Sequence, residues 1–204
     1  MKQSLSSKLH IISLGCSKNL IDSEVMGGQA HSAGMTLVEN PDEADVVIVN
    51  TCGFIGPAKE EALEIILTLA EQKKKSRRDM KLIVAGCLAQ RYGRELLSEI
   101  PEVDLFIGTG EVGRIAQHLQ TLSAAQPRRA AIASKPDFLM TSQHERVLSS
   151  DSPTAYLKIS DGCSNGCTYC AIPSIRGKAR SRRPDDIMLE AQKLVARGIK
   201  EIIL

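Results

Sequence analysis

The residues best suited to chemistry are three cysteines that stand close together in the segment DGCSNGCTYC. Cys163, Cys167 and Cys170 have the spacing C-x3-C-x2-C. A short loop of this kind, with two glycines in it, can wrap a four-iron cluster through three of its corners. Because closed metal sites are structural and open ones do chemistry, three thiolates leave one metal position for a substrate or cofactor.

The other three cysteines each follow a short apolar segment. Cys16 ends IISLGC, Cys52 ends VVIVNTC and Cys87 ends LIVAGC, so that they lie 36 and 35 residues apart. Since the carboxyl ends of parallel strands meet at one edge of a sheet, this spacing predicts that the three thiols converge. A lone cysteine is usually a small buried hydrophobic residue, but three at equivalent strand ends favour a metal or iron–sulfur site.

Apolar segments that alternate with stretches of helical period must position these cysteines. The expected strands are at residues 9–14, 45–50, 81–86 and 103–108. Asp22 is expected to cap the first helix, which would end at Gly34, and Pro57 suits the first turn of the second. The pattern is typical of βαβ units, and therefore of an α/β fold with a parallel sheet.

The pattern changes toward the end of the chain. Residues 123–153 are rich in Ser, Ala, Pro and Arg and show no sustained period, which is typical of a linker. A further strand at 155–160 and a helix at 185–197 then begin a second βαβ unit. We therefore expect a sheet domain at 1–122, a linker, and the start of another domain at 154–204.

Composition narrows the class of protein. A chain of 204 residues can bury a core without disulfides, and six cysteines without an export signal favour free thiols in a reducing cytoplasm. The apolar segment before Cys16 is too short for a signal peptide, and no segment reaches membrane-spanning length. An aromatic content of 3% disfavours a surface that stacks single-stranded bases, whereas a net charge of +2 decides nothing about nucleic acid.

Three weaker patterns have alternative interpretations. GTGEVG at 108–113 fits the dinucleotide-binding pattern G-x-G-x-x-G but lacks the acidic residue expected about 20 positions later, so an ordinary turn is preferred. The basic segment KKKSRR at 73–78 could bind phosphate, although cations are favoured at any helix C-terminus. His144, 19 residues before Cys163, could complete a zinc site instead of an iron–sulfur site.

Taken together, the motifs resemble those of a known family. C-x3-C-x2-C after a strand, with Tyr169 before the last cysteine, is similar to the signature of radical S-adenosylmethionine (SAM) enzymes. SLGCSKNLIDSE, VIVNTCGFIGPAKEE, VAGCLAQRYG and AIPSIRGKARSR resemble segments of the methylthiotransferases within that group. The resemblance covers nearly the whole chain. It is strongest to the branch that modifies an aspartate of a small-subunit ribosomal protein at the decoding centre, and the tRNA-adenosine branch is the alternative.

The resemblance implies a role for each cysteine set. One 4Fe-4S cluster, with SAM on its open iron, would be bound by Cys163, Cys167 and Cys170. A second 4Fe-4S cluster, which carries the sulfur to be transferred, would be bound by Cys16, Cys52 and Cys87. The C–H bond at the β-carbon of aspartate is too strong for a positioned base to break, so a cofactor must supply the hard step.

Four further residues are candidates for cofactor binding: Tyr169, Arg176, Lys178 and Arg180. The three basic side chains could pair with the SAM carboxylate or with an acidic substrate, although a charged loop is often only solvated. The implied partners are the ribosomal protein and an electron donor such as flavodoxin or ferredoxin. We expect a cytoplasmic monomer that does not bind a membrane.

Length sets a last expectation. The family's radical SAM domain is a six-unit (β/α) partial barrel, and residues 154–204 supply only its beginning. The chain is therefore expected to be an N-terminal portion that does not turn over SAM by itself. A non-catalytic iron–sulfur or sulfur carrier and a zinc-stabilised interaction module are the alternatives from other functional classes.

Overall fold

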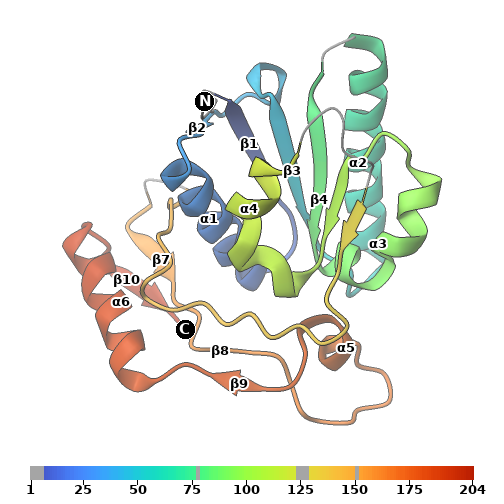
Figure 1. Cartoon of the computed structure of the whole chain (residues 1–204). Coiled ribbons are helices and arrows are strands. Elements are labelled where there is room, and N and C mark those ends of the chain that lie inside the picture. The colour runs from blue at the N-terminus through green and yellow to red at the C-terminus, as the bar shows by residue number, and fades with distance from the viewer. Residues whose placement is uncertain (1–6, 77–78, 123–128, 150–151) are drawn as a thin grey trace.

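The main feature of the fold is a six-stranded parallel sheet with the order β2-β1-β3-β4-β5-β6 (Figure 1). The computed structural model describes residues 7–76, 79–122, 129–149 and 152–204. The strands of the sheet are β1 (Lys8–Ser13), β2 (Thr36–Leu37), β3 (Val46–Thr51), β4 (Lys81–Gly86), β5 (Leu105–Ile107) and β6 (Arg129–Ala131). The expected α/β fold with a parallel sheet is thus confirmed.

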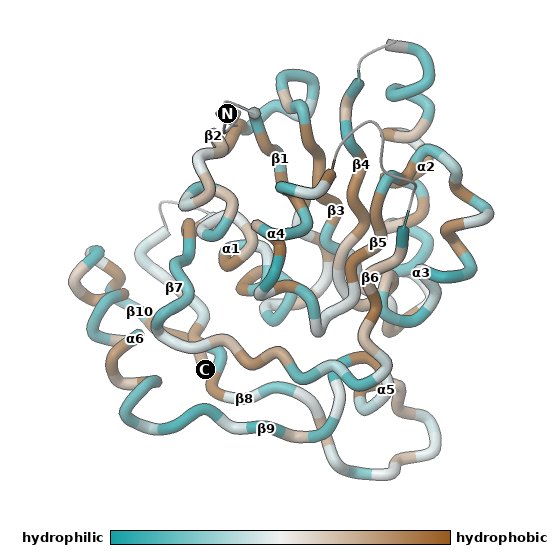
Figure 2. The backbone as a smooth tube through the Cα atoms, viewed as in Figure 1, coloured by the Kyte–Doolittle hydropathy of each residue, from teal (hydrophilic) through white to brown (hydrophobic). Residues whose placement is uncertain are grey.

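Helices cover both faces of this sheet. One face packs against α1 (Ser17–Ser32) and α4 (Ile115–Gln120), and the other against α2 (Gly56–Ser76) and α3 (Cys87–Glu99). Two short 3-10 helices, η1 (Pro41–Glu43) and η2 (Thr109–Arg114), lie in the connections. Because both faces are covered, the central strands are apolar along nearly their whole length, as Figure 2 shows.

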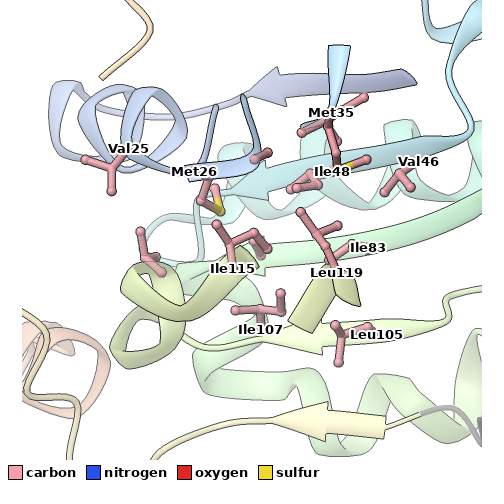
Figure 3. Packing of buried hydrophobic residues seen from close by; sticks show 14 of the residues in the cluster. Val25, Met26, Met35, Val46, Ile48, Ile83, Leu105, Ile107, Ile115 and Leu119 are labelled. Carbon is pink, nitrogen blue, oxygen red and sulfur yellow. The ribbon is translucent and has the colours of Figure 1, made fainter. Parts of the chain in front are cut away.

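Alternation along each strand divides the core between the two faces. Ile48 and Ile83 pack toward α1 and α4, while Val47 and Val49 pack toward α2 and α3. Figure 3 shows Met26 of α1 and Ile115 of α4 gathered over the strands on the first face. This two-sided packing makes the sheet a rigid support for whatever lies at its carboxyl edge.

The first helix begins earlier than the sequence predicts. Its first residue is Ser17, and Cys16 occupies the N-cap position, so the expected capping role of Asp22 is wrong. Asp22 instead lies inside α1 with its carboxylate buried and ion-paired. The end of the helix is as expected, because Gly34 follows it with a φ of +90°.

Residues 152–204 build a smaller unit beyond the carboxyl ends of the strands (Figure 1). Its elements are β7 (Thr154–Tyr156), β8 (Ser160–Asp161), α5 (Ile172–Arg176), β9 (Arg180–Ser181), α6 (Pro184–Ala196) and β10 (Glu201–Ile203). β7 and β10 pair in parallel, and a small core that includes Leu157 and Leu194 joins them to α6. The single strand expected at 155–160 is therefore divided, since β7 ends at Tyr156 and β8 pairs with β9 instead.

Part of the segment expected as a linker packs on the main sheet. Residues 129–131 form β6 beside β5, and Met140 lies in the core under α1 and α4. Residues 123–128 and 150–151 are outside the described part of the chain. The division into domains at 1–122 and 154–204 stays a proposal.

Within the residues that the structure describes, none of the helices is both long enough and apolar enough to cross a membrane.

Candidate functional site

The first cysteine set lies at the carboxyl edge of three neighbouring strands. Cys16 stands between β1 and α1, Cys52 directly follows β3, and Cys87 is the first residue of α3, directly after β4. These strands are adjacent in the sheet, and all six cysteines of the chain are free. The fold thus brings the three residues to one place from positions far apart in the sequence.

Asn19, a fully buried residue in the first turns of α1, links two of these thiols. Its Oδ1 accepts hydrogen bonds from Cys87 Sγ at 3.6 Å and from Cys16 Sγ at 4.0 Å. Its Nδ2 donates to the carbonyl oxygens of Leu14 and Thr51, at 3.1 and 2.8 Å. Asn19 therefore ties the first cysteine set to the ends of β1 and β3.

Two glycines allow the close approach of the chain here. Gly15 has a φ of +95°, and a Cβ atom on it would lie 2.8 Å from Cys52 Cβ. Gly86, with a φ of +92°, would place a Cβ atom 2.3 Å from Asn50 Oδ1. Both positions exclude a side chain, because a substituent would meet atoms that hold the cysteines in place.

The chemistry of this donor set suits an iron–sulfur cluster or zinc. The ligands are three soft thiols, one of them buried, at a sheet edge where backbone approaches closely. Burial raises the pKa of the Cys87 thiol to about 11, and the nearby Arg176 opposes that effect. A metal at this position would bind the thiolate and so replace the proton.

The second cysteine set occupies an exposed loop between β8 and α5. Cys163 and Cys170 are half-buried and Cys167 is exposed. The N–H of Cys163 donates to Gly177 O at 3.1 Å, and the N–H of Cys170 donates to Cys167 O at 3.2 Å. A Cβ atom on Gly166 would meet nothing within 4 Å, so the middle of the loop has open space around it.

Neither set is already arranged as a closed metal site. Across residues 7–76, 79–122, 129–149 and 152–204, there is no group of three or more His, Cys, Asp or Glu side chains placed to hold a metal ion. The assignment of the six cysteines as cluster ligands therefore stays a prediction. The sheet edge and the glycine loop supply the space and the donor types that it requires.

Arg176 lies between the two cysteine sets. It ends α5, is 4% exposed, and its Nη2 donates to Asn19 Oδ1 at 2.7 Å and to Cys87 Sγ at 3.7 Å. Its Nη1 donates to Asp22 Oδ2 at 3.0 Å and to Asp161 Oδ2 at 3.1 Å. Burial lowers and these anions raise its pKa, which on balance lies above the ordinary range. The arginine is thus fully charged and already paired with protein groups.

A buried lysine completes this group of charges. Lys158 Nζ donates to Asp22 Oδ1 at 2.5 Å and to Asp161 Oδ2 at 3.2 Å, and its side chain is 1% exposed. Burial raises the pKa of Asp161, but Lys158 and Arg176 lower it more, so its pKa lies below the ordinary range. We call Asp22, Lys158, Asp161 and Arg176 the buried charge group.

The other candidate cofactor residues lie apart from this group. Tyr169 is 86% exposed, and Lys178 is exposed. The guanidinium of Arg180 donates to backbone carbonyl oxygens, including those of Pro136 at 3.1 Å and Arg176 at 2.9 Å. In this structure Arg180 therefore ties the segment after α5 to the chain near Pro136, and the cofactor roles stay predictions.

The alternative motifs have ordinary structural surroundings. Cβ atoms on Gly110 and Gly113 would meet Pro136 and Phe138, so protein atoms cover the GTGEVG turn. His144 packs its ring edge-on against Phe138, with centroids 5.3 Å apart, and its Nδ1 accepts from the N–H of Thr141. Lys73 in the basic segment pairs with Asp104, and residues 77–78 of that segment lie outside the described part.

A second buried ion network joins α1 to the C-terminal unit. Arg146 donates through Nε and Nη2 to Glu24 Oε2, at 3.0 and 2.5 Å, and through Nη1 to Glu190 Oε1 at 2.5 Å. Glu190 of α6 also pairs with Arg182. Neither this network nor the role of Asn19 was predicted from the sequence. For Asn19 the available signal was the spacing in SKNLIDSE, which places Asn19 and Asp22 on one side of a helix.

Comparison with known proteins agrees with the motifs. Residues 8–108 match the family described as "Uncharacterized protein family UPF0004", and residues 157–204 match the radical SAM superfamily. Proteins named "Ribosomal protein uS12 methylthiotransferase RimO" are similar to this chain along nearly its whole length. The one from Syntrophus aciditrophicus (strain SB) is 52% identical over 200 residues, which are 97% of this chain and 44% of that protein.

Two further relatives with this name show the same relationship. The protein of Heliobacterium modesticaldum is 48% identical over 98% of this chain and 43% of its own length. The protein of Geotalea uraniireducens is 47% identical over 100% of this chain and 45% of its own length. The chain therefore spans less than half the length of the curated relatives it matches. By these matches along nearly all of its residues, the chain is similar to part of the RimO-type methylthiotransferases.

Proposed function

We propose that this chain takes part in adding a methylthio group to the β-carbon of an aspartate in ribosomal protein uS12. The reaction would take place in the cytoplasm with an electron donor such as flavodoxin or ferredoxin. The observation that carries the proposal is the presence of two separate cysteine sets, one at a rigid sheet edge and one in a glycine loop, which are linked through Arg176 and Gly177. About half of the aligned residues are identical to those of relatives named as uS12 methylthiotransferases, which supports uS12 as the substrate.

Each cysteine set would have a distinct task. Cys163, Cys167 and Cys170 would hold the 4Fe-4S cluster at which SAM binds, and Cys16, Cys52 and Cys87 would hold the second one. When bound, these cofactors supply an electron, a radical able to take hydrogen from an unactivated carbon, and the sulfur and methyl to be transferred. The protein supplies position: β1, β3 and β4 fix the first set, and the Gly177 carbonyl fixes the start of the second.

Mass spectrometry of ribosomal protein uS12 and of tRNA tests the substrate. Deleting the gene should remove the methylthio group from the uS12 aspartate and leave tRNA adenosines unchanged. The methylthio group should return with the wild-type gene and not with a Cys163→Ala gene. Loss of methylthio-adenosine instead would assign the chain to the tRNA branch.

Metal analysis after anaerobic reconstitution tests the cofactors. Two four-iron clusters predict about eight iron and about eight sulfide per chain. About one or two zinc per chain, without iron–sulfur absorption, would instead support the interaction module and exclude both an enzyme and an iron–sulfur carrier.

A further inference from the structure

Arg176 is the point at which the second cysteine segment reaches the first cysteine set. Its guanidinium is 3.7 Å from Cys87 Sγ, although 89 residues separate the two in sequence. The next residue, Gly177, accepts the backbone N–H of Cys163 at 3.1 Å. One dipeptide therefore contacts a thiol of the first set with its side chain and a cysteine of the second set with its backbone.

The position of Arg176 is tightly determined. Both of its terminal nitrogens donate to buried side chains, at distances of 2.7 to 3.1 Å from Asn19, Asp22 and Asp161. The helix that ends at Arg176 is held in turn by Thr109, whose Oγ1 donates to Ile175 O at 2.5 Å. Such a constrained guanidinium cannot move away from the sulfur when the charge on the sulfur changes.

The charges of Arg176 and of the ionised groups linked to it do not cancel. Three cations, Lys18, Lys158 and Arg176, interact with two carboxylates, those of Asp22 and Asp161. These five groups together carry one excess formal positive charge, and one of the cations, Arg176, contacts Cys87 Sγ at 3.7 Å. The surroundings are suited to a ligand sulfur that carries negative charge.

We propose that Arg176 is a positioning residue for the first cysteine set, whose fixed positive charge beside Cys87 Sγ raises the reduction potential of the iron–sulfur cluster held there. The inference rests on the proposed function. Its physical basis is that a cation or hydrogen-bond donor at a ligand sulfur stabilises the more negative, reduced form of a cluster. The second cysteine segment would then tune the first cluster through this one side chain.

Redox titration followed by electron paramagnetic resonance tests the proposal. In a parent protein with Cys163, Cys167 and Cys170 replaced by Ala, only the first set can hold a cluster. Arg176→Gln should lower the reduction equilibrium constant about tenfold, a fall of about 59 mV for one electron. Asp22→Asn removes a neighbouring negative charge, so it should shift the midpoint in the opposite direction.

Arg146→Gln is the matched control. The side chain of Arg146 is as buried as that of Arg176 and also bridges α1 to the C-terminal unit, but it pairs with Glu24 and Glu190 rather than with a cysteine. It should destabilise the fold and leave the midpoint unchanged. Equal shifts in Arg176→Gln and Arg146→Gln, or no shift in Arg176→Gln, would overturn the proposal.

Arg176→Lys covers the case in which Arg176→Gln holds no iron. Lysine keeps the charge, so iron bound with a midpoint close to that of the parent supports the proposal. Failure of both variants to bind iron shows that Arg176 serves only the fold and counts against it. A parent protein that binds no iron overturns the proposed function itself, which is a separate result.

Discussion

Lys158 Nζ donates to Asp22 Oδ1 at 2.5 Å, and this buried ion pair joins residues 136 positions apart in the sequence. Asp22 belongs to α1 of the main sheet unit, whereas Lys158 lies between β7 and β8 of the C-terminal unit. The pair shares its charges with Asp161 and Arg176. The contact between the two units near the cysteines is therefore buried and polar. Each charged group in it is paired with more than one of the others.

Replacing the lysine should be costly. Lys158→Met would leave Asp22 and Asp161 paired with Arg176 and influenced by Lys18. Breaking a buried ion pair by removing one partner costs about 3–5 kcal/mol. Urea unfolding measures the loss. Lys8→Met is the control, because its pair with Glu43 is exposed and should contribute less than about 1 kcal/mol. Similar losses in the two variants would contradict the importance of the buried charge group.

Substitution of one glycine should disturb the first cysteine set. Gly86→Ala forces a side chain into a φ of +92° and against Asn50 Oδ1, at a cost of at least about 1–3 kcal/mol. Because Gly86 directly precedes Cys87, iron content after reconstitution should fall as well. Gly56→Ala, where a Cβ atom meets nothing within 4 Å, should preserve both stability and iron content. Equal iron content in the two variants would show that the turn does not position Cys87.

Acid should weaken the attachment of α6. Burial raises the pKa of Asp186, but hydrogen bonds from Ser142 and Arg182 lower it more, so the net pKa lies below its ordinary range. A carboxylate with a depressed pKa contributes stability that is present above the unfolded-state pKa of about 3.9 and is lost as the pH falls below it. The difference in free energy of unfolding between wild type and Asp186→Asn should therefore be constant near pH 7 and shrink below about pH 4.

Asp185→Asn is the control for that titration. Asp185 pairs with Arg183, and both side chains are largely exposed. Its replacement should change the free energy of unfolding less than Asp186→Asn at neutral pH. A difference for Asp186→Asn that does not vary between about pH 7 and pH 3 would show that its hydrogen bonds do not favour the ionised form.

The two cysteine sets should fail in different ways. In the intact protein, Cys163→Ala should abolish reductive cleavage of SAM, because the loop at which SAM is proposed to bind loses a ligand. Cys52→Ala should leave the formation of deoxyadenosine measurable and stop the insertion of sulfur, since the first cysteine set would serve sulfur transfer and not SAM cleavage. Product analysis by liquid chromatography separates these outcomes. Loss of cleavage in both variants would indicate a single shared site.

Local pattern in the sequence was sufficient to predict β1, β3, β4 and β5 and the cysteine edge of the sheet, but not β2 or β6. Apolar segments with a spacing of one βα unit specify parallel strands, and the carboxyl ends of such strands share an edge whatever the details of packing. Cys16, Cys52 and Cys87 could therefore be placed together from the sequence alone. Cys163, Cys167 and Cys170 were grouped by spacing alone, because a loop of eight residues keeps them close.

Tertiary structure alone decided what surrounds those cysteines. Arg176 could be named from the sequence only as a possible partner of a cofactor or an acidic substrate, and the fold adds that it is buried against Asn19 and Cys87. Asp22 was expected to cap a helix, yet it pairs with Lys158. The sequence pattern does not distinguish a charged side chain that is solvated from one that is buried in an ion pair. Asp22 and Lys158 lie 136 positions apart. Only the packing of one unit on the other therefore selects between these two states.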